Sequence, residues 1–445
     1  MRPLFELEKT AINVDWKVLK IKRVLDTPIT DGPHETPELL DEGIPFLSAE
    51  SVKKGKIDFN LKRGYISRED HEKYIKKCKP QRDDIFMIKS GATTGNVAMV
   101  ETDEEFSIWS PLALIRADKE IIQPKYLYYF IGSAAFREQV EISWSFGTQQ
   151  NIGMKVIENL FISIPPLHLQ EKLVHYIENK VVQIDKLIEM KELNIKLLEE
   201  QRQSIITEAV TKGLNPNVKM KDSGVEWIGE IPEHWEIRKI KEIANVYSSN
   251  VDKKSVDGEV EVLLCNYVDV YYNDSITADI DFMKATAKDE QIKTFTLKKH
   301  DVIITKDSES STDIAIPTWV SQDLDGVVCG YHLSLIRCFE NTLGHYLYYT
   351  LESVQIREQF YTRANGVTRF GLSKEAIKNG LIALPPFNEQ LEIAEKLYVV
   401  NQEVRCTIEK VKSQIEKLKE YRQSLIYEAV TGKIDVRDME FDEVR

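Results

Sequence analysis

The chain has 445 residues, more than one ordinary hydrophobic core accommodates, which predicts roughly two to four domains. Hydrophobic residues at 42% and charged residues at 29% are typical of a folded protein and exclude an intrinsically disordered one. The net charge of -13, taken by itself, argues against a nucleic-acid binder, because nucleic-acid-binding domains are usually basic.

The first part of the chain predicts a mixed α and β domain. Short apolar runs such as IPFL, DIFMI and NVAMV are separated by Gly, Pro, Ser and Asp, as strands commonly are. The stretch PKYLYYFIGSAAFREQV, residues 124–140, is expected to be helical. Between Lys53 and Lys89 there are twelve Lys or Arg against six Asp or Glu, which suits DNA phosphates but equally suits a solvated mixed-charge surface.

The motif SGATTGN at residues 90–96 invites a nucleotide-binding interpretation. It lacks the Gly-Lys-Ser/Thr ending that grips phosphates in a P-loop. We therefore expect a turn between two strands.

A long helix is predicted after Pro165 and Pro166. Residues 168–212 contain neither proline nor glycine, and Gly213 then ends the run. Apolar side chains recur every three or four positions, which is the heptad pattern of a helix that packs along a partner helix. They are Val174, Ile177, Val181, Ile184, Ile188, Ile195, Leu198 and Ile205.

The second half of the chain repeats the first. RQSIITEAVT at 202–211 returns as RQSLIYEAVT at 422–431, with eight of ten positions identical. VEVLL, DVIIT and DGVVCGYHLSLIRC predict strands of a second mixed domain, and Pro385 and Pro386 open a second long helix. Its heptad seam comprises Leu397, Val404, Ile408, Val411, Ile415, Leu418 and Leu425.

The two predicted helices have apolar seams of matching length, and the simplest way to bury both seams is to pack the helices against each other. We expect an antiparallel coiled coil with one domain at each end and a pseudo-two-fold axis, because parallel pairing would force residues 214–234 to run back along the helices. The predicted fold class is α+β, two similar mixed α/β domains separated by two long helices. The expected boundaries are 1–165 for domain 1, 166–213 for helix 1, 214–234 for a linker, 235–384 for domain 2, 385–432 for helix 2 and 433–445 for a tail.

Motifs of catalysis are absent from the sequence. IPPL and LPPF lack the Asn or Asp that precedes the prolines in adenine methyltransferases, and there is no GxGxxG, HExxH or GxSxG. The five cysteines show no CxxC spacing, and no apolar run approaches the length of a membrane span. We therefore expect a cytoplasmic protein with free thiols, no membrane contact, and no catalytic, cofactor-binding or metal-binding residues.

Two stiffly spaced, unlike domains suit a DNA target made of two different half-sites around an unread gap. Polar loops carry the amide, hydroxyl and guanidinium groups that fit base edges, although each is equally compatible with an ordinary solvated loop. In the first domain the candidates are Lys53, Lys54, Lys56, Lys62, Arg63, Lys89, Thr93, Thr94, Asn96, Thr148, Gln149 and Gln150. In the second they are Lys306, Ser310, Thr312, Arg363, Asn365, Thr368 and Arg369.

The combination of IPPLHLQEKLVHYI, LPPFNEQLEIAEKL, the two RQS(I/L)I(T/Y)EAVT endings and MKDSGVEWIGEIPEHWEIRKIKEI at 220–243 resembles the specificity subunit of type I restriction-modification systems. The resemblance covers essentially the whole chain. It implies two target recognition domains that each read half of a bipartite site in double-stranded DNA, and helices that dock two modification subunits. Those subunits would bind S-adenosylmethionine and methylate adenine, and restriction subunits would translocate and cleave DNA. The first domain departs from the pattern because it lacks the full WIGEIPEHW preface.

Two other functions compete with this reading. A coiled-coil scaffold would bind proteins through its globular ends without reading bases. An autonomous methyltransferase would transfer methyl groups as a purified chain.

Overall fold

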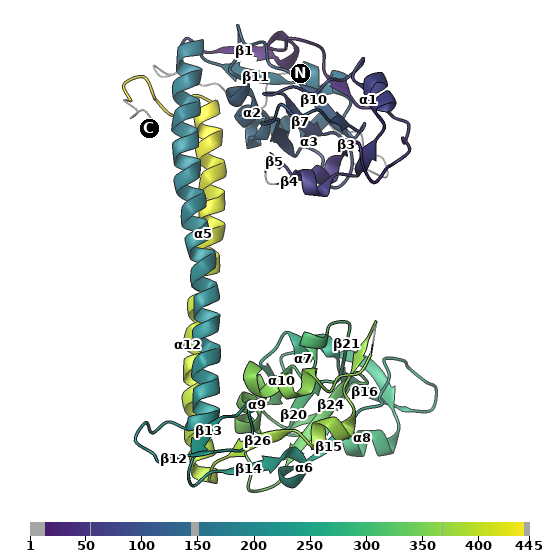
Figure 1. The fold of residues 1–445 in the computed structure, drawn as a ribbon, viewed down its shortest axis with the longest axis vertical. Coiled ribbons are helices and arrows are strands. Elements are labelled where there is room, and N and C mark those ends of the chain that lie inside the picture. Colours follow the sequence, from purple (N-terminus) through teal and green to yellow (C-terminus); the bar gives the residue numbers. More distant parts are fainter. Residues whose placement is uncertain (1–13, 54, 144–150, 367, 440–445) are drawn as a thin grey trace. The chain divides into compact units, whose positions relative to one another are not determined.

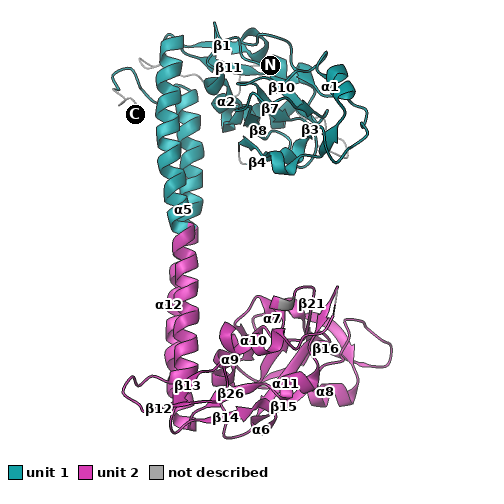
Figure 2. Cartoon of the chain, viewed as in Figure 1, with its two compact units in different colours: residues 1–191, 413–445 teal, residues 192–412 magenta. Residues whose placement is uncertain are grey.

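The computed structural model describes residues 14–53, 55–143, 151–366 and 368–439. Contacts divide the chain into two compact units (Figure 2): unit 1 comprises residues 1–191 and 413–445, and unit 2 comprises residues 192–412. Both predicted long helices are present (Figure 1), α5 at Leu167–Lys212 and α12 at Phe387–Val430. Each helix contributes one segment to each unit.

Unit 1 is built on small sheets with short helices. A four-stranded sheet has the order β2-β10-β7-β8, with bounds Thr30–Asp31, Leu112–Ile115, Ile85–Ile88 and Val97–Met99. A three-stranded sheet has the order β6-β3-β9, with bounds Gly64–Ile66, Ile44–Leu47 and Ser107–Ile108. Two further pairs are β1 with β11, Lys17–Lys20 and Phe161–Ile164, and β4 with β5, Val52–Lys53 and Lys56–Ile57. The α-helices besides α5 are α1 Arg68–Tyr74, α2 Pro124–Gly132, α3 Ala134–Ser143 and α4 Met154–Asn159.

Unit 2 repeats this plan with longer strands. Its five-stranded sheet has the order β15-β24-β20-β22-β17, with bounds Ala244–Ser248, Leu333–Cys338, Val302–Thr305, Pro317–Val320 and Ser275–Ile276. A four-stranded sheet has the order β18-β16-β23-β19, with bounds Met283–Ala287, Val260–Cys265, Leu324–Cys329 and Thr296–Leu297. Three further sheets have two strands each. They pair β12 (Met220–Asp222) with β13 (Glu230–Pro232), β14 (Glu236–Lys239) with β26 (Leu381–Leu384), and β21 (Asp307–Ser308) with β25 (Phe370–Gly371). Its short helices are α6 Ile240–Ile243, α7 Tyr267–Tyr271, α8 Asp289–Phe295, α9 Gly344–Glu352, α10 Val354–Tyr361 and α11 Lys374–Lys378.

The central strand of each larger sheet is buried on both faces, which explains its unbroken apolar sequence. In β7, Ile85 and Met87 face the cluster that contains α2, whereas Phe86 and Ile88 face a second cluster. In β20, Val302 and Ile304 face the cluster that contains α9, whereas Ile303 faces a second cluster. Both sheets therefore lie between a helical layer and a further β layer.

The helical stretch predicted at residues 124–140 is interrupted. Ser133 adopts an extended conformation between α2 and α3, and its hydroxyl donates to the carbonyl of Phe130 at 2.6 Å. Ser353 lies in the same place between α9 and α10 and accepts from the amide of Ile356. A serine at this position can satisfy backbone groups at a helix end, and propensity alone did not reveal the break.

Within each unit, the two long helices run antiparallel. In unit 1, α5 begins near the end of α12: Lys172 Nζ donates to the carbonyl of Arg437 at 2.6 Å, and Lys191 Nζ to Gln414 Oε1 at 2.6 Å. In unit 2, Ile206, Ala209 and Val210 near the end of α5 share a core with Ile393, Ala394 and Leu397 near the start of α12. The antiparallel pairing predicted from the heptads is confirmed within both units.

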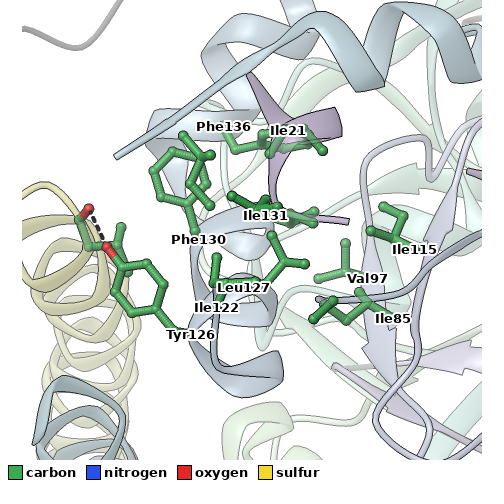
Figure 3. Close-up of a cluster of buried hydrophobic side chains, with 14 of the residues drawn as sticks. Ile21, Ile85, Val97, Ile115, Ile122, Tyr126, Leu127, Phe130, Ile131 and Phe136 are labelled. Carbon is green, nitrogen blue, oxygen red and sulfur yellow. Dashed lines mark hydrogen bonds between the residues drawn. The ribbon is translucent and has the colours of Figure 1, made fainter. Parts of the chain in front are cut away.

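The end of each long helix is built into a globular core. Tyr126 of α2 donates through its hydroxyl to the carbonyls of Ser163 at 2.9 Å and Val430 at 3.2 Å. Figure 3 shows Tyr126 between the buried cluster of unit 1 and the yellow C-terminal helix. Tyr346 of α9 donates to Ala383 at 2.9 Å and to Val210 at 3.4 Å. The two RQS(I/L)I(T/Y)EAVT segments therefore end against equivalent tyrosines of two different domains.

None of the helices within the described ranges combines the length and apolar character needed to cross a membrane. The five cysteines are free, and three of them, Cys78, Cys265 and Cys329, are buried.

Candidate nucleic-acid interface

In unit 1, the loop after β7 meets the segment that leads into α4. Ser90 forms an antiparallel bridge with Asn151, and the amide of Ile152 donates to the carbonyl of Lys89 at 2.9 Å. The amide of Lys89 in turn donates to the carbonyl of Pro111 at 2.9 Å. The residues of the SGATTGN motif connect β7 to β8, as expected of a turn between strands.

Unit 2 contains the same backbone arrangement. The amide of Leu372 donates to the carbonyl of Lys306 at 2.7 Å, and the amide of Lys306 donates to the carbonyl of His332 at 3.0 Å. Asp307 pairs with Gly371 where Ser90 pairs with Asn151 in unit 1. We call this arrangement the loop junction; it comprises Lys89, Pro111 and Ile152 in unit 1, and Lys306, His332 and Leu372 in unit 2. In each unit it joins the two loops predicted to read bases.

Glycine is required where a junction loop turns back sharply in unit 2. Gly366 has a φ of 145°, and a Cβ added there would lie 1.9 Å from the carbonyl oxygen of Arg369. Asn365 and Gly371 exchange backbone hydrogen bonds of 3.0 and 2.8 Å across this turn. The backbone around Arg369 is therefore held by local hydrogen bonds and by a position that only glycine fits.

Among the candidates of the β7–β8 loop, Thr93 and Asn96 are exposed, and Asn96 accepts from Arg137 Nη2 at 3.3 Å. Thr94 is buried and its hydroxyl donates to the carbonyl of Gly91 at 2.7 Å, which supports the turn. Four further candidates, Lys54, Thr148, Gln149 and Gln150, lie outside the described residues.

The basic candidates of unit 1 have unequal access to solvent. Lys53 and Lys56 are exposed on the β4–β5 pair. Lys62 Nζ lies 4.9 Å from the ring centre of Tyr65, and the guanidinium of Arg63 lies 3.9 Å from the ring centre of Trp109. Such stacking fixes the orientation of a cation while it keeps its charge.

Lys89 is held in an internal ion pair. Its Nζ lies 3.1 Å from Asp31 Oδ2, and its side chain is 13% exposed against 1% for Asp31. Burial opposes ionisation of Asp31, but hydrogen bonds from Lys77 and Lys89 outweigh it and lower the pKa of this carboxyl group. Lys89 therefore has a structural partner, and its contact with DNA stays a prediction.

Other charges of the basic stretch are also neutralised locally. Ion pairs join Arg68 to Glu105, Lys73 to Glu35 and Arg82 to Asp103. Counting charges along residues 53–89 missed these acids because two of them, Glu105 and Asp103, follow the stretch and Glu35 precedes it.

In unit 2, several predicted residues serve the loop itself. The hydroxyls of Ser310 and Thr312 lie 2.7 Å apart, and Ser310 caps a short 3-10 turn. Arg363 Nη1 donates to the carbonyl of Asn379 at 3.3 Å. Asn365, Thr368 and Arg369 are exposed beside the junction.

A polar cluster surrounds the unit 2 junction. Lys306 Nζ lies 2.8 Å from Asp307 Oδ2, and His332 Nδ1 lies 3.2 Å from the same oxygen. Arg369 Nη2 lies 3.1 Å from Nδ1 and 3.2 Å from Nε2 of His332. Lys306 Nζ also lies 4.6 Å from the ring centre of Tyr331. Sequence reasoning named Lys306 and Arg369 but missed the other three, because GYHLSLIRC was assigned to a strand and Asp307 is an acid.

Within the described part of the chain, no group of three or more His, Cys, Asp or Glu is placed to hold a metal ion.

The sequence profile of the type I restriction modification DNA specificity domain matches this chain twice, at residues 13–199 and 232–417. The MjaVIII type I restriction enzyme specificity subunit of Methanocaldococcus jannaschii is 23% identical over 440 residues, 98% of this chain and 97% of the relative. The StySPI specificity subunit of Salmonella potsdam is 21% identical over 408 residues, 89% of this chain and 83% of the relative.

Two solved structures share the fold. One, from work on complex assembly and conformational transition of the type I R-M system, has a TM-score of 0.71 at 14% identity and covers 94% of this chain and 98% of its own. The HsdS subunit of Thermoanaerobacter tengcongensis has a TM-score of 0.51 at 17% identity, with 94% and 97% covered.

Proposed function

Since this chain belongs to the family of type I restriction-modification specificity subunits, with two DNA specificity domains, we propose that it reads a bipartite, asymmetric site in double-stranded DNA. Each domain would recognise one half-site through the loops at its junction. The unread gap would be set by the paired helices.

One observation carries this proposal: the loop junctions share their backbone hydrogen bonds but differ in side chains. Ser90, Pro111 and Asn151 of unit 1 are replaced by Asp307, His332 and Gly371 in unit 2. Base edges are distinguished by donor and acceptor patterns, so unlike side chains on a common backbone would select unlike sequences.

We further propose that the long helices dock two modification subunits. Exposed apolar side chains support this role, including Val182 and Met190 in unit 1, and Leu193 and Leu197 in unit 2. The modification subunits would bind S-adenosylmethionine and methylate adenine, restriction subunits would join the complex, and the assembly would act in the cytoplasm. This chain would contribute recognition and no catalytic residue.

Methylation mapping tests the proposal. Cells that lack other adenine methylation would express the chain with its modification subunits, and sequencing would locate the methylated adenines. We expect methylation within one two-part motif with a fixed gap. Methylation without any shared motif would refute base reading, and methyl transfer by the purified chain alone would show that it is itself the enzyme.

Footprinting of the assembled complex separates a DNA reader from a protein-binding scaffold. Protection of two short patches around an indifferent gap is expected of a reader. A scaffold would give no sequence preference in the protected DNA.

A further inference from the structure

Arg369 is an exposed cation beside the unit 2 junction, and His332 contacts its guanidinium. Its Nη2 contacts the imidazole of His332, which in turn contacts the carboxylate of Asp307. Asp307 is also paired with Lys306 at 2.8 Å. The carboxylate therefore contacts His332, the partner of Arg369, and Lys306, and no ion pair among the described residues joins it to Arg369 itself.

The guanidinium keeps most of its donors for a ligand. An arginine side chain presents five N–H groups in a fixed fork. Among the described residues, the hydrogen bonds of Arg369 involve Nη2 alone. A guanidinium that is held through one nitrogen, with its other N–H groups available, is suited to bind two acceptor atoms that lie in one plane.

The backbone around Arg369 restricts the position of its Cα atom. The carbonyl of Arg369 lies where a side chain at Gly366 would have to be, and Phe370 next to it pairs with Ser308 in the β21–β25 ladder. Preorganisation of this kind lowers the entropy lost when a long side chain binds.

Comparison with unit 1 indicates that the cluster is a variable feature on a shared junction. The residues that take the places of Asp307, Tyr331 and His332 are Ser90, Ser110 and Pro111. None of the three can form the ion pair or the imidazole contact. The shared fold therefore does not need this cluster, and its presence in unit 2 calls for a separate role.

We propose that Arg369 reads a guanine in the half-site recognised by unit 2, and that Asp307 and His332 are positioning residues for it. The inference rests on the proposed function, which it deepens by assigning a base to a side chain. A guanidinium fork matches the O6 and N7 acceptors that guanine presents in the major groove, and this is the commonest specific protein–DNA contact.

The test compares variants of the full chain assembled with its modification subunits. Once the motif is mapped, binding is measured on duplexes in which each G·C pair of the unit 2 half-site is replaced in turn. For the unaltered chain, one such replacement should weaken binding roughly 5- to 100-fold. For Arg369→Ala that penalty should fall to near onefold at the same position, with the other half-site read as before.

Matched variants separate a base contact from a general effect. Arg238→Ala removes an exposed arginine of the same unit that pairs with Glu236, and should leave every base preference unchanged. Arg369→Lys keeps the charge but not the fork, and should recover only part of the discrimination. Asp307→Asn and His332→Ala should reduce discrimination at the same base pair without a change in thermal unfolding.

The outcomes are distinct. Uniformly weaker binding to all sequences by Arg369→Ala, with base preferences intact, would assign Arg369 to a phosphate and overturn the proposal. Unchanged binding would overturn it too, while the proposed function stands because the unaltered chain still has a motif. If the unaltered complex shows no motif, the proposed function itself fails and takes this inference with it.

Discussion

At the scale of single residues, glutamines shared by the two halves support the fold rather than recognition. Gln170 and Gln390 each accept from a backbone amide, of Gln123 at 2.8 Å and of Leu343 at 2.8 Å. Gln139 does the same for Phe161 at 2.9 Å. A buried backbone group left without a partner costs roughly 1 to 3 kcal/mol, so these side chains are constrained by the fold.

His345 is a residue that the repeat does not share, since Lys125 lies at its place in unit 1. Its ring stacks on Trp319 with centroids 4.0 Å apart and contacts Tyr349, and its Nε2 has no hydrogen-bond partner among the described residues. Burial, and then the charge of nearby His300, lowers the pKa of His345 from 6.5 to about 4. The folded state therefore favours the neutral ring.

This shift predicts an acid sensitivity of unit 2. Between pH 6.5 and about 4 the unfolded chain binds the proton while the folded chain does not, so stability from this group is present above pH 6.5 and falls as the pH drops. The loss should be roughly 2 to 3 kcal/mol. Thermal unfolding of His345→Phe, measured at pH 7 and pH 5, should show a smaller drop than the unaltered chain. An equal drop in both would contradict the expectation; comparing the two chains removes the contribution of other titrating groups.

At the scale of elements, periodicity predicted the long helices but not the polar contacts within their seam. Asn401 is buried in α12 and accepts from Arg202 of α5 at 3.0 Å, and its amide donates to Asp274 of the globular part of unit 2 at 3.1 Å. Val181 takes this place in α5, as the repeat offset indicates. The seam therefore differs between the two units, which a heptad count of apolar positions does not reveal.

Charged residues introduced into the seam between α5 and α12 test whether recognition of both half-sites depends on the pairing of these helices. Ile184 and Ile408 are 4% and 5% exposed, so Ile184→Asp together with Ile408→Asp should cost on the order of 3 kcal/mol or more and abolish bipartite recognition. Gln183→Asp is the matched control, because Gln183 is exposed on the same helix and its replacement should change thermal unfolding little. Normal bipartite binding by the double variant would count against a recognition role for the paired helices.

At the scale of the whole molecule, the first strand of each globular domain pairs with the last strand of the same domain. Strand β1 pairs antiparallel with β11 so that Lys17 lies opposite Ile164, and β14 pairs with β26 so that Glu236 lies opposite Leu384. The chain therefore enters and leaves each domain at neighbouring points, next to a long helix. Domains with adjacent ends are replaceable as units.

Exchange of one domain should change one half-site. Replacement of residues 235–384 by the corresponding domain of a relative, at the β14–β26 pair, is expected to alter the unit 2 half of the methylated motif and leave the other half intact. Methylation mapping in cells provides the measurement. A change in both halves would show that the domains do not read independently.

The scaffold was more predictable than the site because the two depend on different signals. Apolar runs predicted β7 and β20, and the absence of Pro and Gly predicted α5, since burial and backbone geometry act on contiguous sequence. The cluster of Asp307, His332 and Arg369 depends on the pairing of β21 with β25, which joins residues far apart in the chain. No local pattern encodes that proximity, and the candidate residues for DNA contact stay predictions.

The hydrogen bond from Tyr126 to the carbonyl of Val430 has a consequence for biosynthesis. Unit 2 is continuous, residues 192–412, whereas the core of unit 1 includes Leu425, Ala429, Val430 and Val436 from the C-terminal part of the chain. On the ribosome, the part synthesised first must therefore wait for the last helix turns, with the apolar surface that will meet Leu425 and Ala429 uncovered until they emerge. Synthesis of the end of α12, rather than of its own strands, completes the core of unit 1, so the first part of the chain is exposed to aggregation until that segment has emerged.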